Sequence, residues 1–365
     1  MLTPLQINLR PTYEISRITK GGWQLAGDHG TVEQSRAVND MIAFYDAGIT
    51  TFDCADIYKG VEEMIGEFLR KLKNRRGAAA MAKVKVHTKY VPDIAQLATL
   101  SKRDVSATID RSLQRLGLER LDLVQFHWWD YSVPGYLKAV GFLDELRRDG
   151  KIDQIGVTNF DAEHLAEICA AVDITSAQIQ YSLLDQRPAG SFASVARNNN
   201  VHLLTYGSLA GGFLTDRWLG VCDPGFEFEN RSLVKYRLII EEFGGWGLFL
   251  DLLSTMRAIA DRHGVGIDAI AIRSMLENSD VASVIVGARY AERILATLGV
   301  FRFSLDVDDK AKIAAVLSKA KGPEGPVFAL ERDKFGIHGQ IMKYNLNAGD
   351  QALMGQPEKV TESSV

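Results

Sequence analysis

The chain is organised around the stretch Thr51-Phe52-Asp53-Cys54-Ala55-Asp56-Ile57-Tyr58. An apolar run at residues 47–52 leads into Asp53 in the manner of a buried strand, and Tyr58 follows five positions later. A carboxylate at the end of a strand and a phenol in the loop just beyond it can face the same cavity. The stretch therefore predicts a polar site at one end of a sheet.

Two later segments end in the same way. The run at residues 81–89 finishes with Lys89, and the run at residues 121–127 finishes with His127. If each run is a strand, an ammonium and an imidazole join the carboxylate and the phenol at the ends of successive strands. Four polar groups of four different kinds are therefore expected around one cavity.

These four groups suit the reduction of a carbonyl. A carbonyl that accepts hydride also needs a proton on its oxygen, and a positioned acid lowers the barrier for that step. A free Tyr has a pKa of about 10, but a nearby ammonium lowers that pKa, and a buried carboxylate keeps the ammonium charged and aimed. We therefore expect Tyr58 to give the proton, with Lys89 and Asp53 tuning its pKa. Neutral His127 is expected to hold the carbonyl oxygen by a hydrogen bond.

At these residues the chain resembles the aldo-keto reductases, whose Asp, Tyr, Lys and His tetrad has this order and local context. The likeness continues through residues 112–123, 156–160 and 285–305, and it covers residues 17–305. The resemblance implies an oxidoreductase that reduces an aldehyde or a ketone to an alcohol, with hydride from NADPH or NADH.

Alternating periodicity predicts an α/β fold, a (β/α)8 TIM barrel. Strands are expected at residues 14–19, 47–53, 81–89, 121–127, 151–160, 177–184, 201–206 and 282–286. Helices are expected at residues 31–47, 61–72, 101–116, 135–148, 161–172, 191–198, 248–262, 267–276 and 291–298. Eight alternations, with strands apolar enough to be buried on both faces, favour a closed parallel barrel whose chemistry lies at the carboxyl ends of its strands.

The same pattern gives the domain organisation. Residues 1–305 are expected to form a single barrel domain, with a long loop at residues 207–246 after the seventh strand. Residues 306–365 form a charged C-terminal extension that either lies over the barrel mouth as a lid or trails from it. The acidic group at residues 306–309 lacks the Gly and the distal Glu of a calcium loop, so we interpret it as a solvated helix start.

The cofactor is implied by the resemblance. No Gly-x-Gly-x-x-Gly fingerprint follows the first strand, which argues against a Rossmann domain. Aldo-keto reductases instead lay NADP or NAD extended across the top of the barrel, and the loop with Gly22 and Trp23 would pass near the nicotinamide. The resemblance also implies that Asn159 and Gln178, beside Thr158, hydrogen-bond the carboxamide of the nicotinamide. Tyr206 would stack on the nicotinamide ring. The pyrophosphate would lie along Ser208, Leu209 and Gly211.

The adenosine end departs from the family pattern. That pattern has a Lys-Ser pair, then an Arg, then an Asn, whereas this chain has Gly287-Ala288, Arg289, Arg293 and Thr297 in register. Arg293 matches the Arg that grips the 2′-phosphate of NADP, and a guanidinium fits a phosphate in a bidentate manner. The resemblance therefore implies NADP, with NAD left open because the Lys and the Asn are replaced.

Composition and charge describe an ordinary soluble globular protein. The 365 residues are 46% hydrophobic and 24% charged, and the net charge of -4 gives no reason to expect nucleic acid as a partner. Cys54, Cys169 and Cys222 are too widely spaced for a disulfide framework or a zinc site, which indicates a reducing, cytoplasmic compartment and no metal. The start of the chain lacks a signal peptide pattern, and no apolar run reaches about 18 residues, which argues against a membrane span. The sequence gives no indication of the oligomeric state.

The expected substrate is a small carbonyl compound with an apolar body. Aromatic side chains are expected to build its pocket, namely Trp23, Trp128, Trp129, Phe226 and Trp246.

Each site residue also has an ordinary structural interpretation. Taken singly, Lys89 would be a solvated charge, His127 a core histidine, Asp53 a turn cap and Tyr58 a half-buried aromatic. The implied cofactor contacts would be buried amides that tie loops together, or solvated charges. The joint placement of the four tetrad residues in the family's order favours the catalytic interpretation.

Two other functions fit the same sequence. Some members of the family resemble channel-associated subunits that bind the cofactor and report redox state, and these can retain the tetrad. A phosphosugar isomerase on the same barrel would need a glycine-rich phosphate site after strands seven and eight, which residues 207–212 partly provide. Multiple turnover of simple aldehydes would distinguish a reductase from the redox-reporting subunit. Binding of NADPH would distinguish a reductase from the phosphosugar isomerase.

Overall fold

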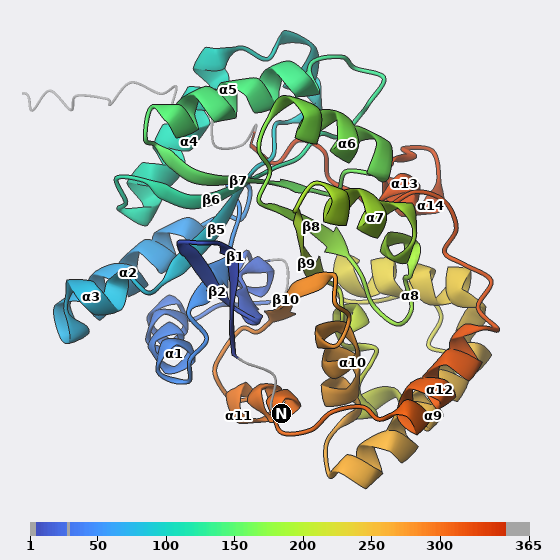
Figure 1. Ribbon diagram of the computed structural model, residues 1–365. Coiled ribbons are helices and arrows are strands. Elements are labelled where there is room, and N and C mark those ends of the chain that lie inside the picture. Colours follow the sequence, from blue (N-terminus) through green and yellow to red (C-terminus); the bar gives the residue numbers. More distant parts are fainter. Residues whose placement is uncertain (1–4, 28–29, 348–365) are drawn as a thin grey trace, which may run out of the picture.

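Eight parallel strands close into a barrel in the computed structural model, which describes residues 5–27 and 30–347 (Figure 1). The strands follow the chain around the barrel until β10 pairs with β3. Their bounds are β3 (Ile18–Gly21), β4 (Thr51–Asp53), β5 (Lys85–Tyr90), β6 (Leu121–Phe126), β7 (Ile152–Thr158), β8 (Ser176–Gln180), β9 (His202–Tyr206) and β10 (Val281–Gly287). The predicted (β/α)8 barrel is confirmed.

Helices form the outer layer around these strands (Figure 1). Those with a predicted counterpart are α1 (Gln34–Asp46), α2 (Val61–Arg76), α4 (Lys102–Leu116), α5 (Tyr136–Arg148), α6 (Ala162–Ala171), α7 (Ser191–Asn198), α9 (Gly245–His263), α10 (Ile267–Leu276) and α11 (Ile294–Leu298). Side-chain hydrogen bonds cap the first turn of two of these helices. Ser101 and Asp104 cap α4 reciprocally, and Asp161 accepts the backbone N–H of His164 at the start of α6.

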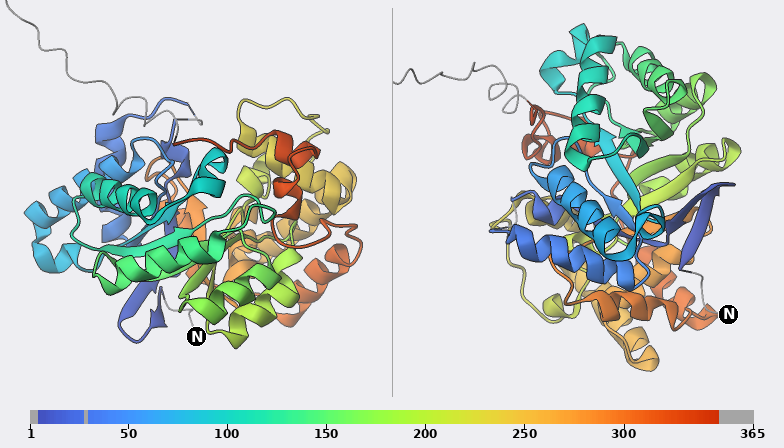
Figure 2. Two further views of the ribbon diagram at one scale, coloured as in Figure 1. Left: turned by 90° about the horizontal axis from the view of Figure 1, so that it is seen from above. Right: turned by 90° about the vertical axis from the view of Figure 1, so that its left-hand side faces the viewer.

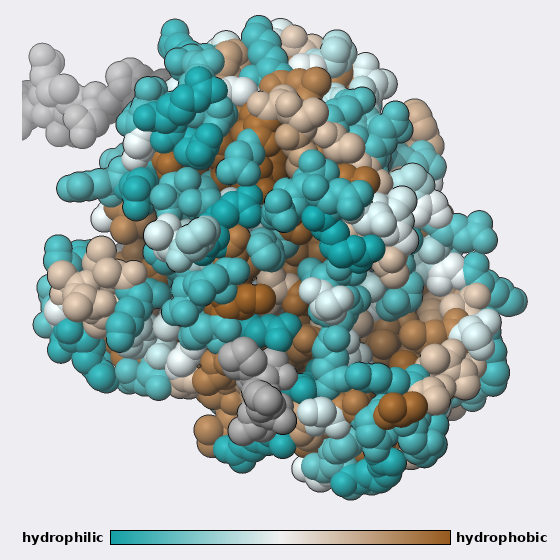
Figure 3. All heavy atoms as spheres, viewed as in Figure 1, coloured by the Kyte–Doolittle hydropathy of each residue, from teal (hydrophilic) through white to brown (hydrophobic). Residues whose placement is uncertain are grey.

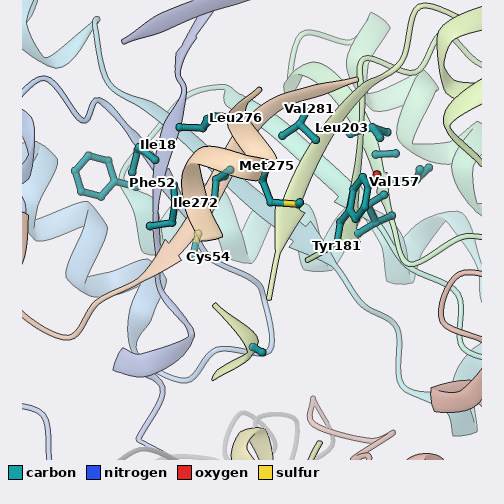
Figure 4. Close-up of a cluster of buried hydrophobic side chains, with 14 of the residues drawn as sticks. Ile18, Phe52, Cys54, Val157, Tyr181, Leu203, Ile272, Met275, Leu276 and Val281 are labelled. Atoms are coloured by element: carbon teal, nitrogen blue, oxygen red, sulfur yellow. The ribbon is translucent and has the colours of Figure 1, made fainter. Parts of the chain in front are cut away.

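The main apolar core lies between the strands and the helices. Figure 4 shows one part of it, where Ile272, Met275 and Leu276 of α10 lie close to strand residues such as Ile18 and Val281. All five side chains are almost completely buried. Burial of this apolar surface stabilises the barrel and sets where each strand ends, which is where the candidate site lies.

An antiparallel hairpin that was not predicted closes the amino-terminal end of the barrel. It consists of β1 (Gln6–Arg10) and β2 (Tyr13–Ser16), and it lies at the opposite end of the barrel from the C-terminal segment (Figure 2). Its buried side chains pack against residues inside the barrel, including Leu123, Leu204 and Ala282. The single strand predicted at residues 14–19 is therefore wrong, because the chain turns at Arg17, whose guanidinium donates to carbonyls of α10 and β10.

Two other predicted boundaries need correction. The strand expected at residues 81–89 begins only at Lys85, since a short helix, α3 (Ala78–Met81), precedes it. The expected irregular loop at residues 207–246 contains two short 3-10 turns, η4 (Ala210–Gly212) and η5 (Asp216–Trp218), and a regular helix, α8 (Arg231–Phe243). Five consecutive residues of α8, 236–240, are buried, so the helix has no clear polar face for its sequence to reveal.

The acidic group at residues 306–309 starts a helix, as predicted, but it is not fully solvated. Asp306 and Asp309 form a capping box at the start of α12 (Val307–Leu317). Asp309 is completely buried, and it pairs with Arg262 and His263 of α9 at 2.8 Å each. These charges fasten α12 to the helical layer.

The surface facing the viewer in Figure 3 is mostly hydrophilic, with small apolar areas between the charged side chains. Among the helices in the described ranges, none has the length and apolar character needed to cross a membrane. Two short helices, α13 (Ala329–Arg332) and α14 (Ile337–Gln340), follow α12 in the C-terminal segment.

Close contact between α2 and α4 gives a test of the packing. A Cβ added at Gly66 of α2 would lie 2.4 Å from the backbone oxygen of Arg115 and 3.0 Å from that of Leu116. Because backbone atoms cannot move aside cheaply, we expect Gly66→Ala to lower the free energy of unfolding by about 1–3 kcal/mol. Gly141→Ala in α5 is the matched control, since that Cβ would meet no atom within 4 Å. It should raise stability by about 0.5–1 kcal/mol, and urea unfolding that shows equal effects of the two changes would contradict the packing.

Candidate active site

The four tetrad residues border one cavity of about 750 Å³ at the carboxyl ends of the strands. Asp53 ends β4, Lys89 lies near the end of β5, His127 follows β6, and Tyr58 lies in the loop after β4. Lys89 Nζ lies 2.7 Å from Asp53 Oδ2 and donates to the Cys54 carbonyl at 2.8 Å. The same ammonium lies 5.0 Å from the centre of the Tyr58 ring. The structure therefore brings together all four residues that the sequence singled out.

Two glutamines complete the surroundings of Asp53. Gln125 Nε2 and Gln178 Nε2 donate to Asp53 Oδ1 at 3.1 and 2.6 Å. Both side chains are almost fully buried, and Gln178 also lines the cavity. Gln178 was predicted only as a cofactor contact, and the structure adds that its amide nitrogen is tied to Asp53. A ligand would therefore meet a carboxamide whose orientation is already fixed.

Burial and charge act in opposite directions on Tyr58 and Lys89. Burial raises the pKa of Tyr58, and the Lys89 ammonium only partly offsets this, so the phenol stays protonated near neutral pH. Burial works against the charged form of Lys89, but Asp53 and Tyr58 outweigh it and raise the pKa of Lys89 above its usual range. Lys89 does lower the pKa of Tyr58, as expected, but this effect is smaller than the effect of burial. The net pKa of Tyr58 is therefore raised.

His127 is neutral, and its hydrogen bond fixes its tautomer. Burial, followed by the nearby Arg332 cation, lowers the pKa of His127 to about 3. Its Nδ1 lies 3.0 Å from the Thr158 carbonyl, which can only accept, so Nδ1 carries the proton. Nε2 is then an acceptor, and it is buried without a partner among the described residues. The prediction that neutral His127 donates to the carbonyl oxygen is therefore not supported by this geometry.

Most of the predicted cofactor contacts lie in the wall of the same cavity. They are Trp23, Thr158, Asn159, Gln178, Tyr206, Ser208, Leu209, Gly211, Gly287, Arg289, Arg293 and Thr297. Gly22 is the exception among the predicted set. A Cβ at this position would lie 2.6 Å from the Asp53 carbonyl oxygen and 2.8 Å from Val61, so Gly22 is a close-packing residue behind the wall.

Asn159 lies where the nicotinamide end of the cofactor is predicted to bind. This residue has a positive φ of 61°, which is uncommon for a residue other than Gly. Its backbone N–H donates to the Gln178 carbonyl at 3.0 Å, and its Oδ1 accepts from the Tyr206 hydroxyl at 2.8 Å. The amide and the Tyr206 ring are therefore fixed relative to each other before any ligand binds.

Packing around Gly287, at the predicted adenosine end of the cavity, explains one departure from the family pattern. A Cβ at Gly287 would lie 2.2 Å from Gln24 Nε2, so Gln24 occupies the space that a longer side chain at 287 would need. Arg289 Nε and Gln24 Oε1 are buried here and have no partner among the described residues. Arg293 is 69% exposed and pairs with Asp268, so its guanidinium can reach a ligand only by sharing or leaving that carboxylate.

The cavity carries the opposite charge to the chain as a whole. Eight Lys and Arg residues line it against four Asp and Glu residues, although the chain has a net charge of -4. One of the eight, Lys20, is buried, and burial lowers its pKa to about 7, so it is only partly charged at neutral pH. A positive cavity of this size with unpartnered guanidinium and amide atoms fits an anionic dinucleotide.

The predicted aromatic pocket is only partly present. Trp23 and Trp129 line the cavity, and the Trp23 ring lies 5.0 Å from that of Tyr58. The other three residues belong elsewhere. Trp128 is buried and donates to the carbonyls of its own loop, and Phe226 is exposed on the surface. Trp246, in the first turn of α9, packs in an aromatic cluster with Phe213 and Phe249.

Residues of α8 and the C-terminal segment take the place of those aromatic side chains. They are Lys235, Tyr236, Phe328, Ile341, Met342, Lys343 and Leu346, and none was predicted. No short motif marks them, because each reaches the cavity only through long-range packing.

Arg332 of α13 anchors the C-terminal segment on one side of the cavity. Its guanidinium donates to the backbone carbonyls of Trp128, Trp129 and Asn159, and it lies 3.9 Å from the centre of the Tyr131 ring. The carbonyls belong to the loops that follow β6 and β7. Arg332 therefore fixes the two loops that carry His127 and Asn159.

A second anchor lies next to the first, on the loop that follows β5. The backbone N–H of Ile94 donates to the Tyr344 carbonyl at 2.9 Å, and Asn347 bonds both Asp93 and the Val91 carbonyl, each at 2.9 Å. The two anchors hold the C-terminal segment across the barrel mouth (Figure 2). The rest of the predicted extension, residues 348–365, lies outside the described residues.

Comparisons with known proteins show the family and the fold of the chain. A sequence model of the aldo/keto reductase family matches residues 17–318. The NADH-specific methylglyoxal reductase of Escherichia coli (strain K12) is 25% identical over 311 residues, which cover 81% of this chain and 92% of that protein. Aldo-keto reductase YhdN of Bacillus subtilis (strain 168) is 27% identical over 321 residues, which cover 86% and 94%. The solved structure of the glycerol dehydrogenase AKR11B4 from Gluconobacter oxydans matches with a TM-score of 0.72 at 23% identity, over 88% of this chain and 98% of that one, and shares its fold.

The state of His127 can be measured directly. Arg332→Met removes one of the two causes that lower the pKa of His127, so we expect this pKa to rise from about 3 toward the ordinary value of about 6.5. An NMR titration of the His127 imidazole would show this, and it would also show the proton on Nδ1 in the unmodified protein. A His127 that already titrates near pH 6.5 in the unmodified protein would contradict the assignment.

Proposed function

Because the chain belongs to the aldo/keto reductase family, we propose that it is an oxidoreductase that reduces an aldehyde or a ketone to an alcohol with a reduced nicotinamide cofactor. The observation that carries the proposal is the buried ion pair of Lys89 and Asp53 beside Tyr58 in a cavity. Membership of the family removes the phosphosugar isomerase alternative. The redox-reporting alternative differs from the proposal in predicting no multiple turnover.

In this proposal Tyr58 gives the proton to the carbonyl oxygen. When bound, the reduced nicotinamide supplies the hydride that the carbonyl carbon accepts. Tyr58 is protonated at neutral pH because it is buried, so the acid form is the resting form. As its proton leaves, the phenolate develops beside Lys89, and the ammonium stabilises that charge in a site with little water. Asp53 acts by keeping Lys89 charged and in place.

His127 takes a different role from the predicted one. With its proton on Nδ1, its Nε2 accepts hydrogen bonds inside the cavity. We propose that Nε2 accepts the hydroxyl of the alcohol product, or a hydroxyl next to the carbonyl of the substrate. This role orients the reacting group without requiring a charged imidazole.

The cofactor would be held by residues that are already fixed by hydrogen bonds. We propose that Asn159 and Gln178 bind the carboxamide, that Tyr206 stacks on the nicotinamide ring, and that Ser208, Leu209 and Gly211 follow the pyrophosphate. Arg289 and Arg293 would bind the phosphate at the adenosine end, which favours NADP. The Escherichia coli relative is named as NADH-specific, and the pairing of Arg293 with Asp268 is compatible with NAD as well.

The proposed substrate is a small carbonyl compound, and the protein is proposed to work in the cytoplasm. Support for a reducing compartment comes from Cys54, Cys169 and Cys222, all of which are free thiols. The methylglyoxal reductase named among the relatives makes methylglyoxal a suitable first substrate to assay.

Removal of the Tyr58 hydroxyl tests the chemical step. Tyr58→Phe keeps the ring that packs 5.0 Å from Trp23 but removes the proton donor, so kcat with methylglyoxal should fall by about 100-fold or more. The dissociation constant of the reduced cofactor, measured by fluorescence titration, should change by less than about threefold. Undiminished turnover in the variant would rule out Tyr58 as the acid. Absence of turnover in the unmodified protein with bound cofactor would favour the redox-reporting alternative.

Removal of the Arg293 charge tests the cofactor preference. If Arg293 leaves Asp268 to bind a 2′-phosphate, Arg293→Met should lower kcat/KM for NADPH by about 10-fold or more, because a charge-assisted hydrogen bond is lost. The value for NADH should stay within about threefold, since NADH has no phosphate at that position. An unmodified protein that prefers NADH would remove this role from Arg293.

A further inference from the structure

A lysine that the proposed chemistry does not use faces the cavity from α8. The side chain of Lys235 is 14% exposed and lines the cavity wall. Its Nζ lies 5.2, 5.7 and 5.5 Å from the ring centres of Tyr206, Tyr236 and Phe328. Three aromatic rings therefore surround the stem and the ammonium and hold the charge at one place in the wall.

The ammonium keeps hydrogen-bonding capacity for a ligand. Its carboxylate partner is Glu331, at 3.6 Å, which is longer than an ordinary hydrogen bond. Glu331 is the carboxylate that faces Lys235 Nζ, and the contact is long. An ammonium carries three donors, and a partly buried one without acceptors costs free energy unless a ligand or water completes it.

The carboxylate beneath Lys235 is shared with a second cation. Glu331 is completely buried and lies between Lys235 and Arg187, whose guanidinium is 3.4 Å away. Arg187 in turn pairs with Asp185 at 2.7 Å. This buried network fixes Glu331 from behind, and the Lys235 charge is its only member that lines the cavity.

Lys235 lies one aromatic ring away from the reacting end of the cavity. The Phe328 ring is 5.7 Å from the His127 ring and 5.5 Å from Lys235 Nζ. Tyr206, the second ring beside Lys235, donates its hydroxyl to Asn159 at 2.8 Å. A ligand whose carbonyl lies at Tyr58 and His127 would therefore meet Lys235 a few bonds further along.

We propose that Lys235 binds an anionic group of the carbonyl substrate, a carboxylate or a phosphate, and so selects aldehydes and ketones that carry a negative charge near the carbonyl. The inference rests on the proposed function, because it assigns the substrate class of the same site. Two features support it. The cavity has an excess of cations in its wall, and a charge pair formed there is little screened by water. A lysine, as a point charge on a flexible stem, suits either kind of anion.

Matched pairs of aldehydes test the proposal. Succinic semialdehyde and butanal differ by a carboxylate, and glyceraldehyde 3-phosphate and glyceraldehyde differ by a phosphate. Lys235→Met should lower kcat/KM for the charged member of at least one pair by about 10-fold or more, mainly through KM, and for the neutral member by less than about threefold. The pair that responds identifies the anion. Lys235→Arg should keep most of the discrimination, because it keeps the positive charge.

Two controls make the result specific. Lys319→Met removes an exposed lysine that does not line the cavity, and it should change neither pair. The KM for the reduced cofactor should be unchanged in Lys235→Met, because the anion is assigned to the substrate. A rise in the cofactor KM alone, or an equal loss for charged and neutral aldehydes, would overturn the proposal.

A binding measurement separates this inference from the proposed function. Succinate, which cannot be reduced at this site, should bind the unmodified protein in calorimetric titrations and should bind Lys235→Met at least about 10-fold more weakly. If succinate binding depends on Lys235 while no aldehyde is turned over, the anion site stands and the reductase proposal fails. If aldehydes are reduced but neither catalysis nor succinate binding depends on Lys235, the anion site fails and the reductase proposal stands. Thermal unfolding of Lys235→Met and Lys235→Arg identifies any loss that comes from misfolding.

Discussion

The buried ion pair between Lys89 and Asp53 sets the conditions that the rest of the site has to meet. Removing two charges from water costs several kcal/mol for each ion, and their attraction repays this only when other hydrogen bonds complete both groups. The closed barrel supplies these bonds. Gln125 of β6 and Gln178 of β8 donate to Asp53, and the carbonyl of Cys54 accepts from Lys89. The pair can therefore exist only where several strands have converged, and the position of the chemistry follows from the closure of the sheet.

Desolvation at the strand ends gives the neighbouring groups their separate states. The same burial that raises the pKa of Tyr58 lowers that of His127 to about 3, because burial always favours the uncharged form. The result is a phenol that retains its proton beside an imidazole that has no charge. Lys89, in contrast, stays ionised, since Asp53 is its direct ion-pair partner. Desolvation thus gives one acid, Tyr58, and one acceptor, His127, in the same cavity.

The sequence could predict the parts of the molecule that depend on local pattern. The strand end at Asp53, the strand that carries Lys89 near its end, and the caps at Ser101 and Asp161 follow from periodicity and turn chemistry, and the structure has them, although both strands begin later than expected. The parts that depend on long-range packing were missed. The N-terminal hairpin has too few residues for a clear alternation, and α8 is buried on several faces. Its Lys235 lines the cavity, and no local pattern around it predicts that position.

The charge of the cavity shows why the chain-wide average misleads about its ligands. A net charge of -4 would repel an anion at long range, but exposed charges are largely screened beyond about 8–10 Å at physiological ionic strength. A ligand at the barrel mouth therefore responds mainly to the side chains that line the cavity, where Lys and Arg outnumber Asp and Glu. Low-dielectric walls made by Phe328, Trp129 and Tyr206 strengthen that local field. The acidic surface and the basic cavity are thus compatible, because each acts over a different distance.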